Sequence, residues 1–290
     1  MDVVPSLISH VFNPSFKAYE FLDSLDAAKN ESAAALADPQ TEIFEKLHQI
    51  AFRTGLGNSV CTPASSFSGI ARADIAEFAQ SHFTPDRITI VGSGVNHQEL
   101  KDLVETAFEG VTLSTILSHV PESHFYAGEA RIDAGPHSDA QYVIAYPGTP
   151  YTSSNYPASQ VLAAMLGAKE PANYVHHQGL LASATHNETI AKSFSVSYSD
   201  AGLLGIEVKG DATDVRVVAS SAIEILHSIA KGVTSQALAD GIKAAIIQSE
   251  EALTRRGLLD ALGKDSKTFG TQELSAISKV TAEQVQKVFL

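Results

Sequence analysis

The sequence contains one cysteine and no long apolar run. Cys61 on its own excludes an intrachain disulfide framework and any zinc site built from several cysteines. No uninterrupted apolar stretch approaches the roughly 20 residues that a membrane-spanning helix requires. We therefore expect a chain that does not itself cross a bilayer, and we interpret Cys61 as a small buried residue that needs no function.

Basic residues are too few for binding to anionic surfaces. The chain has 20 Lys and Arg against 33 Asp and Glu, a formal net charge of -13, which repels nucleic acid and anionic lipid. Its 290 residues and 44% hydrophobic content suffice for two buried cores and exclude a disordered chain. The residues from Met1 to Ser6 resemble neither a secretion signal nor a mitochondrial presequence, so the protein stays where it is made or its beginning is missing.

Common catalytic motifs are absent as well. The sequence holds no Gly-x-Ser-x-Gly, no phosphate-binding Gly-x-x-x-x-Gly-Lys-Ser/Thr and no His-x-x-Glu-His. Arg87–Gly94 resembles a dinucleotide-binding turn, but His97 stands where the third glycine belongs, which favours a strand-to-helix turn over a cofactor site. The adjacent His176 and His177 diverge on any regular element, which favours a loop over a metal site. We predict no catalytic residue, no metal site and no cofactor.

The spacing of apolar residues predicts both helices and strands. Between Asp38 and Arg53 they recur at helical spacing, and His48 on this helix is interpreted as a surface or interface residue rather than a ligand. Helices are predicted over residues 38–53, 73–82, 96–108, 156–167, 215–230 and 235–262, and strands over residues 87–91, 129–134, 141–146, 192–199 and 203–210. Consecutive strands followed by consecutive helices indicate an α+β fold.

Two segments that lie 210 residues apart resemble each other. Ile70–Phe78 and Val280–Val288 both begin with a branched apolar residue and carry further apolar residues five and eight positions later. Each segment also follows a long amphipathic helix that another helix precedes. A repeat of this kind predicts two homologous domains.

The expected domain boundaries follow from this repeat. We expect residues 1–118 to be the remnant of a first domain, residues 119–127 a linker, and residues 128–290 a second homologous domain that is truncated at its C-terminus. The second copy has strands ahead of its helices that have no counterpart before Met1. We therefore expect roughly 80 to 100 residues to be absent, judged by the length of the surviving copy.

A longer pattern resembles the pitrilysin-type peptidase family. Its residues are Glu45, Leu47, His48, Ala51, Phe52, Arg53, Gly57 and Asn58, followed by the helix after Ile70, by His82 and Phe83, and by Arg87–Leu100. The family includes the mitochondrial processing peptidase and the core subunits of complex III, and Phe16–Asp23 and Ala37–Pro39 are most similar to the core subunits, fungal ones above all. The resemblance is specific over the first 110 residues and diffuse beyond them.

The resemblance implies two homologous α+β domains and a function without catalysis. Active members bind zinc through His-x-x-Glu-His and a later Glu. Glu31 lines up with that later Glu, but the chain offers it no partners, so it is read as a solvated helix carboxylate. Gly167–Ala172 lacks the glycine-rich loop of the regulatory processing-peptidase subunit.

The same resemblance implies a location and partners. It places the protein on the matrix side of the mitochondrial inner membrane, as a scaffold subunit beside core subunit 1, cytochrome b and the Rieske protein. The alternative is a zinc peptidase of the processing type, or its non-catalytic partner subunit.

Overall fold

The chain forms two compact units in a computed structural model. The first comprises Met1–Glu45 and Asn58–Pro121, and the second comprises Lys46–Gly57 and Glu122–Leu290. The structure describes residues 3–12, 14–83, 88–90, 92, 94–108, 121–133, 135, 139–167, 179–185, 188–263 and 271–288. The two units are described in turn.

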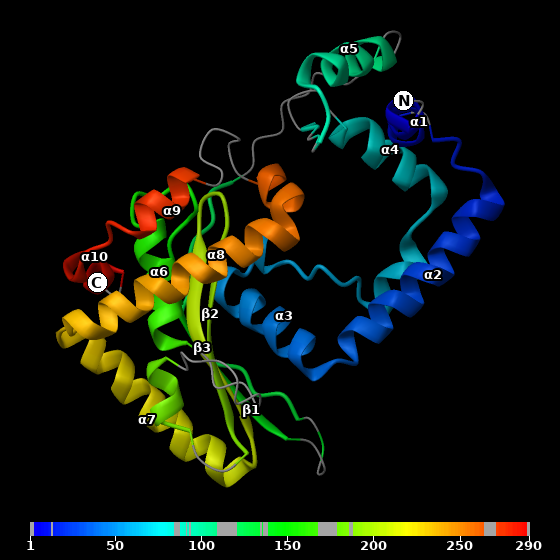
Figure 1. Cartoon of the computed structure of the whole chain (residues 1–290). Coiled ribbons are helices and arrows are strands. Elements are labelled where there is room, and N and C mark those ends of the chain that lie inside the picture. The colour runs from blue at the N-terminus through cyan, green and yellow to red at the C-terminus, as the bar shows by residue number, and fades with distance from the viewer. Residues whose placement is uncertain are drawn as a thin grey trace. The chain divides into compact units, whose positions relative to one another are not determined.

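A three-stranded antiparallel sheet lies at the centre of the second unit (Figure 1). Its strands are β1 (Ala140–Pro147), β2 (Ile190–Ser197) and β3 (Gly202–Gly210), in the spatial order β1-β3-β2. Ile206 in β3 lies opposite Ile144 in β1 and Ser193 in β2. A tight turn joins β2 to β3. It is closed by a hydrogen bond of 2.8 Å from the Tyr198 amide to the Ala201 carbonyl.

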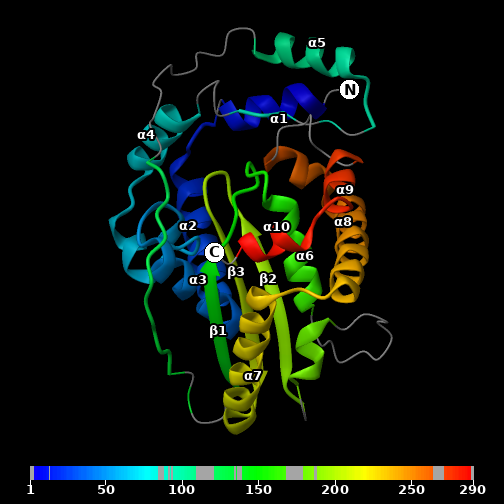
Figure 2. The same ribbon diagram turned by 90° about the vertical axis from the view of Figure 1, so that its left-hand side faces the viewer.

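Helices cover one face of this sheet and form the main core with it. They are α6 (Tyr156–Leu166), α7 (Ala212–Lys231), α8 (Ser235–Gly263), α9 (Thr271–Ile277) and α10 (Ala282–Lys287). Figure 2 shows α6, α7 and α8 on the same side of the strands. Because side chains alternate along a strand, Leu204, Ile206 and Val208 of β3 point into this core. The helices supply the other large buried side chains, among them Val161, Leu162, Met165, Leu166, Val218, Leu226, Ile277 and Val285.

Helix α7 shows why the sequence folds in this way. Asp211 is its N-cap, and the Asp211 side chain accepts the Thr213 amide at 2.9 Å. The hydrogen bonds from the Thr213 side chain and amide hold the pKa of Asp211 below its usual value. Apolar residues then recur every three or four positions along α7 and are buried in the core.

On the opposite face of the sheet, the end of helix α3 (Pro39–Phe52) packs against β3. The helix enters the second unit from Lys46 onward. Its last residues, Ala51 and Phe52, form a second buried cluster with Leu203 of β3. The helix ends at Phe52; the next residue, Arg53, has a φ of 61°, and a short 3-10 turn at Gly55–Gly57 follows.

A buried carboxylate lies on the same face of β3. Glu207 is 3% exposed, and its Oε2 lies 3.0 Å from Lys192 Nζ on the neighbouring strand. The register places these two residues directly opposite each other. Cross-strand pairs of opposite charge stabilise a sheet, so this ion pair supports the register of β2 against β3.

The first unit contains helices with very little core. They are α1 (Val3–Phe12), α2 (Ala18–Leu36), α4 (Arg72–His82), α5 (His97–Phe108), the first part of α3 and a 3-10 helix at Ala64–Gly69. Among its described residues only Ile8 and Phe67 are fully buried apolar side chains. Its described residues also include no strand. Several large apolar side chains on these helices are exposed, among them Leu7, Tyr19, Leu22 and Phe78.

The predicted α+β fold is confirmed, but two predicted strands are wrong. Ile88–Ile90, the described part of the segment 87–91, forms no strand, and neither does the described part of 129–134. The first segment has the β-branched composition of a strand and the second its alternation of polar and apolar residues. A strand also needs a hydrogen-bonded neighbour, and neither segment pairs with a described strand. Asn96 does begin a helix as expected, since its Oδ1 accepts the Gln98 amide at 2.9 Å.

The proposed domain boundaries stay a prediction. The division into compact units falls between Pro121 and Glu122 and assigns Lys46–Gly57 to the second unit. Residues 119 and 120 of the expected linker lie outside the described residues.

Candidate functional site

The contact between α3 and the sheet of the second unit is made by aromatic side chains. His48 and Phe52 are one helical turn apart and therefore share a face of α3. A hydrogen bond of 2.7 Å joins His48 Nε2 to the Tyr198 hydroxyl at the end of β2. The Phe52 and Tyr198 rings meet edge to face with their centroids 6.3 Å apart. We call His48, Phe52 and Tyr198 the α3 contact; it fixes the helix to the sheet.

The segment that follows Glu122 is tied to the same region. The Tyr126 amide donates to the Ala51 carbonyl at 2.7 Å, and the Arg53 guanidinium lies 4.2 Å from the centre of the Tyr126 ring. The Ser123 amide donates to Asp200 Oδ2 at 2.8 Å, which lowers the pKa of Asp200. Both ends of this short segment are thus held, one by α3 and the other by the β2–β3 turn.

Removing the Tyr198 hydroxyl tests whether the α3 contact stabilises the second unit. Because one half-buried hydrogen bond is lost, Tyr198→Phe is expected to lower the free energy of unfolding by about 1 kcal/mol. Urea denaturation followed by circular dichroism measures it. Tyr142→Phe, at an exposed position on the edge strand β1, is the matched control, and an equal loss in both variants would show that the hydrogen bond contributes nothing.

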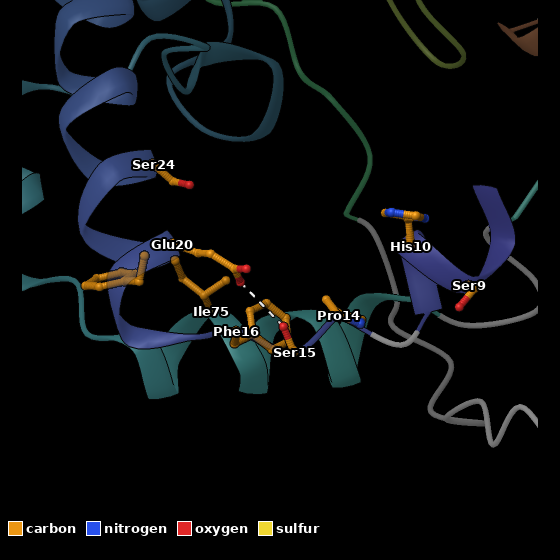
Figure 3. A pocket seen from close by; sticks show the side chains of 9 residues that line it. Ser9, His10, Pro14, Ser15, Phe16, Glu20, Ser24 and Ile75 are labelled. Atoms are coloured by element: carbon orange, nitrogen blue, oxygen red, sulfur yellow. Dashed lines mark hydrogen bonds between the residues drawn. The ribbon is translucent and has the colours of Figure 1, made fainter. Parts of the chain in front are cut away.

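The first unit contains an open depression of about 620 Å³. Figure 3 shows Ser9 and His10 of α1 on one side of it, Glu20 and Ser24 of α2 on another, and Ile75 of α4 at its edge. The remaining lining residues are Pro14, Ser15, Phe16 and Phe21. Ser15 Oγ donates to Glu20 Oε2 at 3.4 Å, so part of the polar lining is already paired within the chain. Phe16, Phe21 and Ile75 supply its large apolar side chains.

Most residues that the sequence singled out for chemistry lie apart from each other. Glu31 is exposed on α2, and Cys61 is half-buried rather than buried. His176 and His177, with residues 168–172 of the loop after Gly167, lie outside the described residues. Within the described ranges no group of three His, Cys, Asp or Glu side chains could hold a metal ion. Among the same residues no helix is long and apolar enough to cross a membrane.

Sequence reasoning placed His48 at a surface or interface but missed its partners. Tyr198 lies 150 residues further along the chain, and no local pattern connects the two positions. Arg53 and Tyr126 were missed for the same reason. The one available signal was the helical spacing of His48 and Phe52, which marks a shared face but not what that face meets.

Comparison with known proteins shows which family the chain resembles. The family model described as the Peptidase M16 inactive domain matches residues 69–245. Subunit 2 of the cytochrome b-c1 complex from Yarrowia lipolytica is 29% identical over 265 residues, which cover 91% of this chain and 59% of that protein. Subunit alpha-2 of the mitochondrial processing peptidase from Dictyostelium discoideum is 28% identical over 298 residues, 97% of this chain and 65% of that protein. The chain thus spans less than two thirds of these curated relatives.

A solved structure shows the same fold. A chain of complex III2 from Candida albicans, with Inz-5 bound, superimposes with a TM-score of 0.82 over 98% of this chain and 71% of that one, at 17% identity. These matches confirm the resemblance to pitrilysin-type peptidases. The family model covers more than half of the sequence, and the chain therefore belongs to the M16 peptidase family, through its inactive domain.

Proposed function

We propose that the chain is a non-catalytic core subunit of complex III, equivalent to core subunit 2, which supports the assembly and stability of the complex. The observation that carries this proposal is the match to the Yarrowia lipolytica subunit 2 over 91% of the chain. The match to an inactive peptidase domain agrees with a role without catalysis. No His-x-x-Glu-His occurs in the sequence, which supports the same reading.

Under this proposal the protein acts by binding other subunits of complex III and not by catalysis. It lies on the matrix side of the mitochondrial inner membrane, pairs with core subunit 1 and is held to the membrane by cytochrome b and the region of the Rieske protein. The open apolar side chains of the first unit support such a role, because a soluble protein that exposes many large apolar residues on neighbouring helices is suited to bind other proteins. Those residues include Leu7, Tyr19, Leu22, Ile75 and Phe78.

A processing peptidase, or its non-catalytic partner subunit, is the second candidate. The similarity to the alpha-2 subunit of the Dictyostelium discoideum processing peptidase favours it. This candidate requires cleavage of presequence peptides by the complex that contains the chain. The two candidates therefore differ in which proteins accompany the chain and in whether that assembly has peptidase activity.

Affinity purification from detergent-solubilised mitochondria tests the proposal. The chain, tagged at its C-terminus and expressed in its own organism, is expected to bring down cytochrome b and the Rieske protein and to migrate with complex III on a native gel. Recovery of neither protein would contradict the core-subunit proposal. Recovery of a peptidase subunit instead, with zinc-dependent cleavage of a presequence peptide by the eluate, would favour the second candidate.

A further inference from the structure

The segment that begins at Pro121 has no regular structure of its own. Its described residues, 121–133, form neither helix nor strand, and none of them is buried. Phe125 and Tyr126, its two large aromatic residues, are each 37% exposed. Contacts with other elements of the second unit therefore hold this segment in place.

Two backbone hydrogen bonds attach the segment to the second unit. The Ser123 amide donates to the Asp200 carboxylate in the β2–β3 turn at 2.8 Å. The Tyr126 amide donates to the Ala51 carbonyl near the end of α3 at 2.7 Å. The segment thus crosses from the turn of the sheet to the helix that packs on the sheet.

Two side-chain contacts complete the attachment at the end of α3. The Arg53 guanidinium lies over the Tyr126 ring, 4.2 Å from its centre. Gly128 lies directly against the helix, because a Cβ atom at this position would be 2.5 Å from Ile50 Cγ2. We call residues 122–128, which carry all four contacts, the strap.

The strap is also where one connection between the two units is anchored. The chain passes between the units three times, at Glu45–Lys46, Gly57–Asn58 and Pro121–Glu122. The first two passages bound the end of α3 and its 3-10 turn, and the third is the start of the strap. The strap therefore decides where the third connection leaves the second unit.

The contacts of the strap are weak beside those of the main core. One hydrogen bond shifts an equilibrium by about a factor of five, and a cation–π contact at an exposed site contributes no more than that. The sheet and its helices share a large buried apolar cluster to which the strap adds no residue. Segments with few buried apolar contacts open at a lower free energy than the unit to which they belong.

We propose that residues 122–128 are a releasable strap, which opens as one piece while the end of α3 and the sheet stay folded. Opening breaks the contacts to Asp200, Ala51 and Arg53 together, because a short extended segment carries all of them. Extended chain spans about 3.3 to 3.6 Å per residue, so release adds roughly 20 Å of free chain to the third connection. The strap is thus a device that sets the length of that connection.

Amide hydrogen exchange of the full 290-residue chain, followed by mass spectrometry, tests whether the strap opens by itself. We expect strap peptides to exchange at least tenfold faster than β3 peptides. Their rate should stay constant in urea below the unfolding transition, because an opening that exposes little surface depends little on denaturant. A common rate and a common urea dependence for the strap and β3 would overturn the proposal. The isolated chain suffices, so the result is independent of the proposed function.

Two variants test the contacts that close the strap. Tyr126→Leu removes the ring that lies over Arg53, and Asp200→Ala removes the acceptor of the Ser123 amide. Each is expected to speed exchange in the strap about fivefold and to leave β3 unchanged. Asp139→Ala, which removes an exposed carboxylate of the same unit, is the control and should change neither.

Two results with these variants would contradict the strap. One is exchange in the strap that Tyr126→Leu and Asp200→Ala change no more than Asp139→Ala does. The other is an equal acceleration of β3 in Tyr126→Leu, because the strap would then be part of the cooperative unit. Tyr126 lies outside the sheet, so this variant remains decisive even if Asp200→Ala loosens the β2–β3 turn. Circular dichroism of each variant shows whether the helices are intact.

Discussion

Gly205→Ala is expected to lower the free energy of unfolding of the second unit by about 3 kcal/mol, at the upper end of the usual cost of overpacking. Gly205 lies in the middle of the central strand β3, opposite Ala145 and Phe194. A methyl group at this position would lie 2.5 Å from the Phe194 ring and even closer to the Ile144 carbonyl oxygen. The carbonyl belongs to the backbone of the neighbouring strand, so it cannot move without disturbing the ladder between β1 and β3.

The matched control for this substitution is Gly232→Ala in the same unit. Nothing lies within 4 Å of a methyl group at Gly232, and its φ of 171° is ordinary extended backbone. We expect a change of at most about 0.5 kcal/mol there. Urea titration by circular dichroism compares the two variants. Equal midpoints would mean that the sheet relaxes around the added methyl group and that the close packing of Phe194 over Gly205 is not a constraint.

The sequence predicted those elements whose signals are local. The helices over residues 156–167, 215–230 and 235–262 correspond to α6, α7 and α8, and the paired strands over 192–199 and 203–210 correspond to β2 and β3. An element with one buried side repeats its apolar residues at a fixed period, about 3.6 residues in a helix and two in a strand, so the sequence alone reveals its type.

Features that depend on distant partners could not be predicted. The segment 129–134 alternates polar and apolar residues as a half-buried strand does, yet in its described residues Glu129 and Arg131 pair with each other in solvent at 2.9 Å. Strand propensity measures how well a side chain fits a pleated surface, not whether a neighbouring strand is present. The meeting of His48 with Tyr198 is of the same kind, because only the folded chain brings them together.

Helix α3 shows most clearly that sequence alone does not reveal distant packing partners. Because Asp38–Arg53 lies within residues 1–118, all of it was expected in the first domain. The amphipathic pattern predicted the helix itself correctly. The pattern could not reveal that the C-terminal part of α3 packs on the sheet of the second unit. A boundary drawn by sequence position alone would therefore separate Phe52 from the residues it is buried against.

Phe52→Ala is expected to lower the free energy of unfolding of the second unit by about 3 to 5 kcal/mol, the usual cost of truncating a fully buried phenylalanine. Phe52 is 2% exposed, packs with Leu203 and meets the Tyr198 ring edge to face. Alanine removes these contacts and leaves a cavity under α3. Amide hydrogen exchange in β3 reports on the second unit specifically and should become faster. Phe78→Ala removes the same ring from an exposed position on α4 and should leave β3 unchanged in the isolated chain. If β3 exchanges equally in both variants, α3 is not an integral part of the second unit, and the buried cluster around Leu203 is stable without it.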